Sequence, residues 1–139
     1  MWRASLKGAD FLEAKLSAAE FIRANLTRAG FLGADLEGAS LAGSNLEGAD
    51  FWKAILVGAN LYKANLARTM LWRANLERAN FAEAKLEGAV LGKARLLGVL
   101  NLTVEQLSTV KTIQGAVLDA NLRKEIGRAC PNILGEPQR

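Results

Sequence analysis

Residues 24–36 read ANLTRAGFLGADL, and this stretch shows the pattern on which the whole chain is built. A small residue is followed two positions later by Leu or Phe, and the pair recurs every five residues. From Leu6 to Leu96 every fifth residue is Leu or Phe, at nineteen consecutive positions, and the residue two before it is alanine in seventeen of them. The exceptions are Ser44 and Thr69. The chain is therefore a tandem repeat with the unit A-x-(L/F)-x-x.

A period of five excludes one long amphipathic helix, because equivalent side chains would rotate by about 140° from one unit to the next. In an extended backbone, residues two apart point to the same side, so the small residue and the Leu or Phe both point inward. The two remaining positions must turn a corner. Glycine recurs at the second of them, where its tolerance of positive φ eases a tight turn. These glycines are Gly8, Gly33, Gly38, Gly43, Gly48, Gly58, Gly88 and Gly98.

Four of the units match A-(D/N)-L-x-x most closely: Ala24-Asn25-Leu26, Ala34-Asp35-Leu36, Ala64-Asn65-Leu66 and Ala74-Asn75-Leu76. On these residues the chain resembles the pentapeptide-repeat family, over roughly residues 1–100. The resemblance implies an all-β fold, a right-handed quadrilateral β-helix solenoid with four units per coil. Coils of twenty residues would stack about 4.8 Å apart, in a rod of about five coils.

We expect two parts, a β-helix over residues 1–100 and a short α-helical C-terminal cap with two helices and a tail over residues 101–139. The segment Thr103-Val104-Glu105-Gln106 has the form of a capping box, with Leu102 and Leu107 as its hydrophobic staple. It predicts a helix over about 104–110. A second helix is expected over 121–129, ended by Pro131.

A period of twenty sorts the inward and outward residues into columns. The phenylalanines fall on two opposite sides, Phe11, Phe31 and Phe51 on one and Phe21 and Phe81 on the other. On a side between them, Asn25, Asn45 and Asn65 align as a predicted hydrogen-bonding ladder.

The candidate binding surface is an outward apolar column edged by cations. We expect the partner-binding residues to be Leu12, Leu32, Trp52, Trp72, Met70 and Val90, with Lys53, Arg73 and Lys93 as a basic rim. An exposed apolar and aromatic patch edged by Arg is typical of a protein interface. The alternative is that these large side chains merely cover the backbone. A weaker column on the opposite side contains Trp2, Ile22 and Tyr62, with Arg3, Arg23 and Lys63.

Composition disfavours several other functions. The chain has no histidine and one cysteine, Cys130, so we expect no metal site, no disulfide and no cofactor. Without a histidine or a Gly-rich phosphate loop, an enzyme is not expected. The net charge of +4 is a small surplus, and Asp10, Glu13 and Asp50 share a side with the tryptophans, which disfavours nucleic acid as a partner. No apolar run of about eighteen residues is present, so no membrane segment is expected and a bacterial cytoplasmic location is the default.

The leading hypothesis is a non-enzymatic scaffold or regulator that binds another protein. The alternative, implied by the resemblance, is a DNA-mimicking modulator of DNA gyrase or another topoisomerase. The acidic residues that such mimicry needs cluster only near the middle of the rod, at Asp35, Glu37, Glu47 and Asp50. At the other end, Met1-Trp2-Arg3-Ala4-Ser5-Leu6 is already in register, so either this uncapped N-terminal coil pairs in a homodimer or the chain is part of a longer protein.

Overall fold

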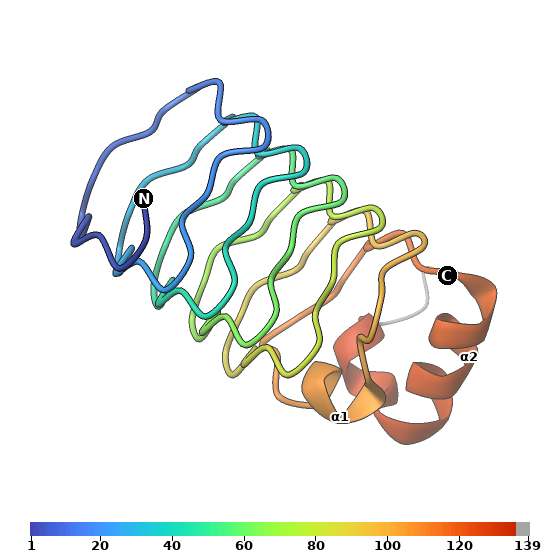
Figure 1. Ribbon diagram of the computed structural model, residues 1–139. Coiled ribbons are helices and arrows are strands. Elements are labelled where there is room, and N and C mark those ends of the chain that lie inside the picture. The colour runs from blue at the N-terminus through green and yellow to red at the C-terminus, as the bar shows by residue number, and fades with distance from the viewer. Residues whose placement is uncertain (136–139) are drawn as a thin grey trace.

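The computed structural model describes residues 1–135, as a stack of similar coils with helices at its C-terminal end (Figure 1). The end of the predicted C-terminal part, residues 136–139, lies outside the described residues.

Successive coils are joined by parallel bridges between residues twenty apart. The bridges run from Ser5↔Asn25 to Asn80↔Leu100. In the first of them, Leu6 N–H donates to the Asn25 carbonyl at 2.8 Å and Asn25 N–H donates to the Ala4 carbonyl at 2.8 Å. Within residues 1–135 the ladder consists of isolated bridges rather than continuous strands. The reason is geometric, since each side of the coil is extended for only about three residues before the next turn.

From Leu6 to Ala94 each corner is a four-residue turn closed by a backbone hydrogen bond. In the first complete turn the Leu6 carbonyl accepts from Ala9 N–H at 3.0 Å. The residue before Ala9 is Gly8, with φ of +70°. Positive φ at this position confirms the predicted role of the recurrent glycines, although longer side chains also occupy it, such as Lys53 at +58°.

The inward columns form one continuous core. Phe11 and Phe31 stack with ring centroids 4.9 Å apart, and Phe31 and Phe51 at 4.7 Å, which confirms the predicted phenylalanine column. The opposite column meets it across the interior, since Phe11 and Phe21 are in edge contact at 5.6 Å. From the second coil onward these Leu, Phe and Ala side chains are buried.

Ser44 and Thr69, which replace alanine in the repeat, bury hydroxyl groups that are both hydrogen-bonded. Ser44 Oγ donates to the Leu41 carbonyl at 2.6 Å, and Thr69 Oγ1 donates to the Leu66 carbonyl at 2.8 Å. Each hydroxyl bonds within its own turn, so it replaces a methyl group without leaving a buried polar atom unpaired.

The predicted asparagine ladder forms only in part. Asn65 Nδ2 donates to Asn45 Oδ1 at 3.3 Å, but Asn25 Oδ1 accepts from Thr27 Oγ1 at 2.6 Å. A neighbour within its own turn therefore takes the acceptor that the ladder would need.

The C-terminal region contains α1 (Val104–Leu107), α2 (Ala120–Ala129) and the 3₁₀ helix η1 (Pro131–Leu134). The capping box at Thr103 and Gln106 is present as predicted. The first helix ends earlier than expected, because Ser108 Oγ and Thr109 Oγ1 bond the Glu105 and Gln106 carbonyls at 2.6 and 2.7 Å. The second begins at Ala120, one residue before the prediction, and η1 was not predicted.

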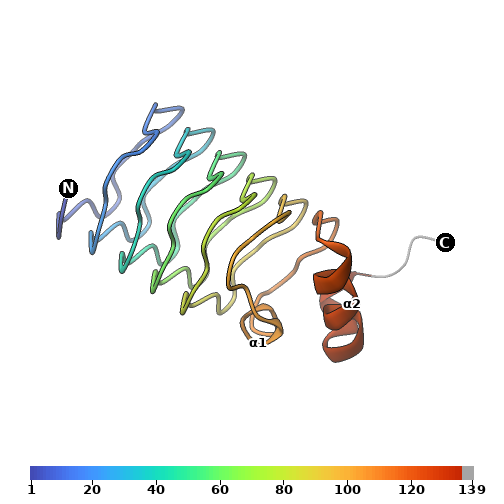
Figure 2. The ribbon, with the colours of Figure 1, turned by 45° about the vertical axis from the view of Figure 1, so that its right-hand side comes forward.

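After α1 the chain returns to the solenoid for half a coil. Val90↔Thr112 and Arg95↔Val117 are again parallel bridges, now between residues 22 apart, so α1 is inserted into the wall of an otherwise regular coil. Beyond this half coil, α2 lies at the C-terminal end of the stack (Figure 2).

Candidate partner-binding surface

The predicted apolar column exists as a contiguous surface feature, which we call the apolar stripe: Leu12, Leu32, Trp52 and Trp72. Its members lie in consecutive coils. A backbone hydrogen bond beside the stripe joins each of these coils to the next. The bonds run from Glu13 N–H to Leu32 O, from Gly33 N–H to Trp52 O and from Lys53 N–H to Trp72 O, at 2.9, 2.9 and 3.1 Å. The stacking of coils therefore brings together four residues that are far apart in the sequence.

The stripe is only partly exposed. Leu12 is 57% exposed and the adjacent Met70 42%, whereas Leu32, Trp52 and Trp72 are half-buried. Met70 and the half-buried Val90 are bridge partners along the same edge of the stripe. Lys53, Arg73 and Lys93 are exposed. The structure thus places all nine predicted residues on one side of the rod.

The apolar stripe ends at Trp72, because the Trp72 indole covers the next position of the column. The next position of this column is Gly92, which is buried, and a Cβ built there would lie 2.0 Å from Cζ3 of Trp72. The indole therefore lies flat over the Gly92 backbone. Trp72 is therefore buried in part because it covers the backbone, which is what the alternative interpretation of these large side chains predicts.

Each outward aromatic ring is also covered by a cation. Lys53 Nζ lies 4.6 Å from the ring centroid of Trp52, and Lys93 Nζ lies 5.9 Å from that of Trp72. The same arrangement recurs in Trp2 with Arg3 and Tyr62 with Lys63. A nucleobase could stack on the covered face of these rings only after displacing the cation, which leaves one free face per ring and further disfavours single-stranded nucleic acid. The sequence carried a signal for three of these pairs, because the covering cation directly follows Trp2, Trp52 and Tyr62, whereas the cation over Trp72 comes from the next coil.

The basic rim has no carboxylate partner within residues 1–135. The ion pairs there are Lys63 with Glu83, Arg68 with Glu47 and Arg95 with Glu77. Asp50 lies in the same column as Met70 and Val90 and is the acidic residue of that column nearest to the basic rim. Its Oδ1 accepts a hydrogen bond from Trp52 N–H at 2.9 Å. The rim is therefore a column of three cations in successive coils, about 4.8 Å apart along the rod.

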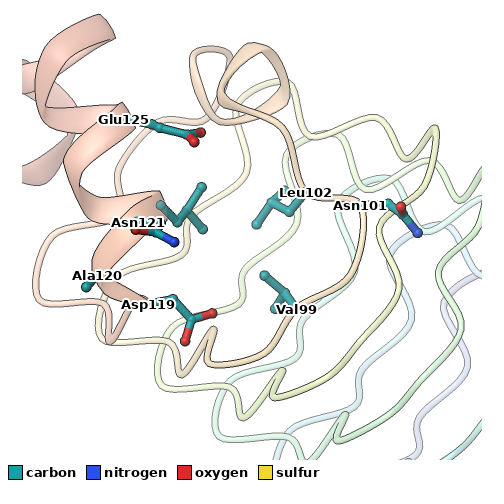
Figure 3. A pocket seen from close by; sticks show the side chains of 8 residues that line it. Val99, Asn101, Leu102, Asp119, Ala120, Asn121 and Glu125 are labelled. Carbon is teal, nitrogen blue, oxygen red and sulfur yellow. The ribbon is translucent and has the colours of Figure 1, made fainter.

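A pocket of about 500 Å³ lies between α2 and the last full coil (Figure 3). Val99, Leu102 and Leu122 form its apolar part, while Asp119 and Glu125 add carboxylates. Asp119 Oδ2 accepts from Gly98 N–H at 2.9 Å, so this side chain also bonds the open edge of the coil. None of the predicted site residues lines this pocket.

Among the described residues, no group of three His, Cys, Asp or Glu side chains is placed to hold a metal ion. No helix in residues 1–135 is long and apolar enough to cross a membrane.

The family model for pentapeptide repeats matches residues 2–31, 34–72 and 59–98, with eight copies, and so covers more than half of the chain. The chain belongs to the pentapeptide repeat family. Pentapeptide repeat proteins form right-handed quadrilateral β-helices, in agreement with the bridges between residues twenty apart. They are in general non-enzymatic structural or interaction proteins.

Solved structures of other pentapeptide repeat proteins resemble this chain. HetL, involved in heterocyst differentiation regulation in the cyanobacterium Nostoc sp. strain PCC 7120, is 28% identical with a TM-score of 0.46, and the match covers 84% of this chain and 60% of HetL. A pentapeptide repeat protein from the Arabidopsis thaliana thylakoid lumen is 25% identical with a TM-score of 0.42, over 90% of this chain and 75% of that one. A trypsin-treated form of QnrB1, a plasmid-mediated fluoroquinolone resistance protein, is 20% identical with a TM-score of 0.50, over 91% of this chain and 84% of that one. The likeness to QnrB1 shows the fold alone. A search of curated proteins gave no match.

The structure also explains the Asp or Asn of the pentapeptide repeat, a role that sequence reasoning missed. Its side-chain oxygen accepts from the backbone N–H two residues later, which is an Asx turn. This bond occurs at Asp10, Asn25, Asp35, Asn45, Asp50, Asn60, Asn65, Asn75 and Asn80. The recurrence of Asp and Asn at one repeat position was the available signal. These side chains stabilise the turns through their hydrogen bonds. Their presence on a surface therefore does not indicate a binding site.

Proposed function

We propose that this chain is a bacterial, cytoplasmic, non-enzymatic scaffold or regulator that binds another protein through the apolar stripe and its basic rim. The observation that carries the proposal is the alignment of Leu12, Leu32, Trp52 and Trp72 in consecutive coils, beside Met70 and Val90. A half-buried aromatic surface with a polar rim matches the anatomy of protein interfaces.

The rim indicates the charge of the partner. Lys53, Arg73 and Lys93 lie in successive coils without ion pairs in residues 1–135, so they repel one another. Carboxylates of a partner would relieve this repulsion. An acidic protein surface with apolar side chains between its acidic residues is therefore the expected partner.

We further propose that the two parts of the chain have different roles. Residues 1–100 form the β-helix that presents the surface, and residues 101–139 cap the C-terminal end of the stack. Gln106 supports this role for α1, because its Nε2 donates to the Phe81 and Ala84 carbonyls of the last full coil.

At the other end we propose a homodimer through the first coil. The backbone N–H and carbonyl of Ser5 make no hydrogen bond within residues 1–135, because its bridge to Asn25 uses the N–H of Leu6 and the carbonyl of Ala4. An open edge of this kind is a template for pairing with a second copy.

The gyrase alternative has weaker support. A DNA mimic needs a continuous acidic surface, but Glu47 is paired with Arg68, and Asp35 and Asp50 bond their own turns. A supercoiling titration with purified gyrase is the direct test, and inhibition at micromolar protein would favour this alternative over the scaffold.

The experiment for the proposed function is a pull-down from bacterial lysate with the double variant Trp52→Glu, Trp72→Glu. The control is Val57→Glu, at the same turn position on another side of the coil. We expect a protein that the natural chain and the control retain, and that the double variant loses by about thirtyfold or more in affinity. Circular dichroism must show all three forms folded. Equal capture by all three would refute the stripe as the binding surface.

A further inference from the structure

The side opposite the apolar stripe contains a second candidate site, which goes beyond the proposed function. A pocket of about 370 Å³ is lined by Ile22, Arg23, Ala42, Gly43, Tyr62 and Lys63. We call it the Ala42 pocket. It falls on the column that sequence analysis ranked as the weaker of the two.

The pocket arises from a gap in a column of larger side chains. Ile22, Ala42 and Tyr62 occupy one position in three successive coils, joined by hydrogen bonds from Arg23 N–H to Ala42 O and from Gly43 N–H to Tyr62 O, both 2.8 Å. Ala42 and Gly43 leave space between their neighbours. Arg23 extends over part of it, since its Cγ lies 3.1 Å from a Cβ built on Gly43.

The width of the gap fits one flat side chain. Ile22 and Tyr62 are two coils apart, which corresponds to about 9.6 Å along the rod. A ring needs about 3.5–4.0 Å to carbon atoms on each of its faces, or roughly 7–8 Å between two walls. An aromatic side chain therefore fits between Ile22 and Tyr62, with its edge toward Ala42.

Two cations flank the pocket. Lys63 Nζ lies 5.3 Å from the Tyr62 ring centroid and 3.7 Å from Glu83 Oε2. The Tyr62 side chain beside it, and then the Glu83 carboxylate, raise the pKa of Lys63 above its usual value, so Lys63 is a cation at neutral pH. Arg23 has no ion pair within residues 1–135 and is free to bind a carboxylate.

We propose that the Ala42 pocket binds an aromatic side chain of an acidic peptide segment of a partner protein. The ring inserts between Ile22 and Tyr62, and the flanking carboxylates pair with Arg23 and Lys63. A basic segment is repelled by the same two cations. A nucleic-acid strand is disfavoured, because the next residue of the cationic column is Glu83, where a phosphate backbone would have to continue.

The test uses capped tripeptides as probes and amide NMR shifts of the full chain as the readout. We expect acetyl-Glu-Phe-Glu-amide to shift the amides of Ala42, Gly43 and Tyr62. Acetyl-Lys-Phe-Lys-amide and acetyl-Glu-Ala-Glu-amide should bind at least about tenfold more weakly. Equal shifts with either control peptide, or larger shifts with an oligothymidylate, would overturn the proposal.

Two variants make the test independent of folding problems. Ala42→Leu fills the pocket and should weaken the acidic peptide at least about tenfold, whereas Ala67→Leu, the same exchange on another side, should not. Arg23→Gln with Lys63→Gln removes the charges and should cause a similar loss while leaving the core untouched. Retention of binding by the folded Ala42→Leu chain, or by the double variant, contradicts the proposal. The Trp52→Glu, Trp72→Glu chain should still bind the peptide, which separates this site from the stripe.

Discussion

The side-chain amide of Gln106 donates a 3.0 Å hydrogen bond to the carbonyl of Ala84. In the regular coils this carbonyl position accepts from a backbone N–H 21 residues later, as Ala79 does from Leu100 at 2.9 Å. At Ala84 the corresponding residue is Glu105, which has left the ladder to enter α1. Gln106 thus replaces a missing backbone rung with its side chain, and its Oε1 at the same time accepts from Thr103 N–H at 2.8 Å in the capping box.

We expect Gln106→Glu to destabilise the protein by about 1–3 kcal/mol, because a carboxylate keeps the capping box but cannot donate to the Phe81 and Ala84 carbonyls. Urea unfolding measures the change, with Glu105→Gln as the control in the same helix. The loss should shrink as the pH falls toward the ordinary Glu pKa of about 4.3, because facing carbonyls raise the folded-state pKa of the introduced carboxyl and its protonated form can donate. A loss that does not depend on pH would contradict this account.

Gly92→Ala should destabilise the protein by about 1–3 kcal/mol and push the Trp72 indole into water, because the new Cβ would overlap the ring. The readouts are the unfolding midpoint and a red shift of tryptophan fluorescence. Gly30→Ala is the matched control, since a Cβ there meets only Asp10 Oδ1 at 3.6 Å. If Trp72→Ala does not relieve the cost of Gly92→Ala in a double-mutant cycle, the contact is not its source.

Proline placed at two adjacent positions should have opposite effects. Leu56 N–H donates to the Asn75 carbonyl at 2.7 Å and its side chain is buried, so Leu56→Pro should unfold the solenoid. Val57 is the second residue of a turn, a position that proline favours, and its N–H makes no hydrogen bond within residues 1–135. Val57→Pro should therefore fold with about the natural stability. Circular dichroism and thermal unfolding compare the two, and a folded Leu56→Pro chain would refute the inward assignment of Leu56.

Sedimentation velocity tests pairing through the first coil. We expect the natural chain to be a dimer and Ser5→Pro to be a folded monomer, because proline removes the outward donor while the bonds to the second coil remain. Ser5→Ala keeps the N–H and should stay dimeric. A natural chain that is monomeric at about 100 μM, far above the Kd of a stable dimer, would eliminate this interface.

Much of the candidate surface could be predicted because it follows from the repeat itself. Once coils hold twenty residues, Trp52 and Trp72 must be neighbours, and the structure places them so. The Ala42 pocket could not be recognised in the same way. Large outward residues stand out in the repeat pattern, whereas this pocket is formed by two small residues between larger neighbours.

The sequence by itself determined which residues point inward, where the chain turns and where the first helix begins, because these properties depend on neighbours within five residues. Leu56, Gly58 and Thr103 could each be assigned from local pattern alone. Only the tertiary structure decided what happens between coils: that Trp72 lies over Gly92, that Gln106 completes the edge at Ala84, and that Thr112 rejoins the ladder beside Val90. Those contacts join residues about twenty apart, and they depend on how four turns close each coil and on which way a side chain leans across its neighbour.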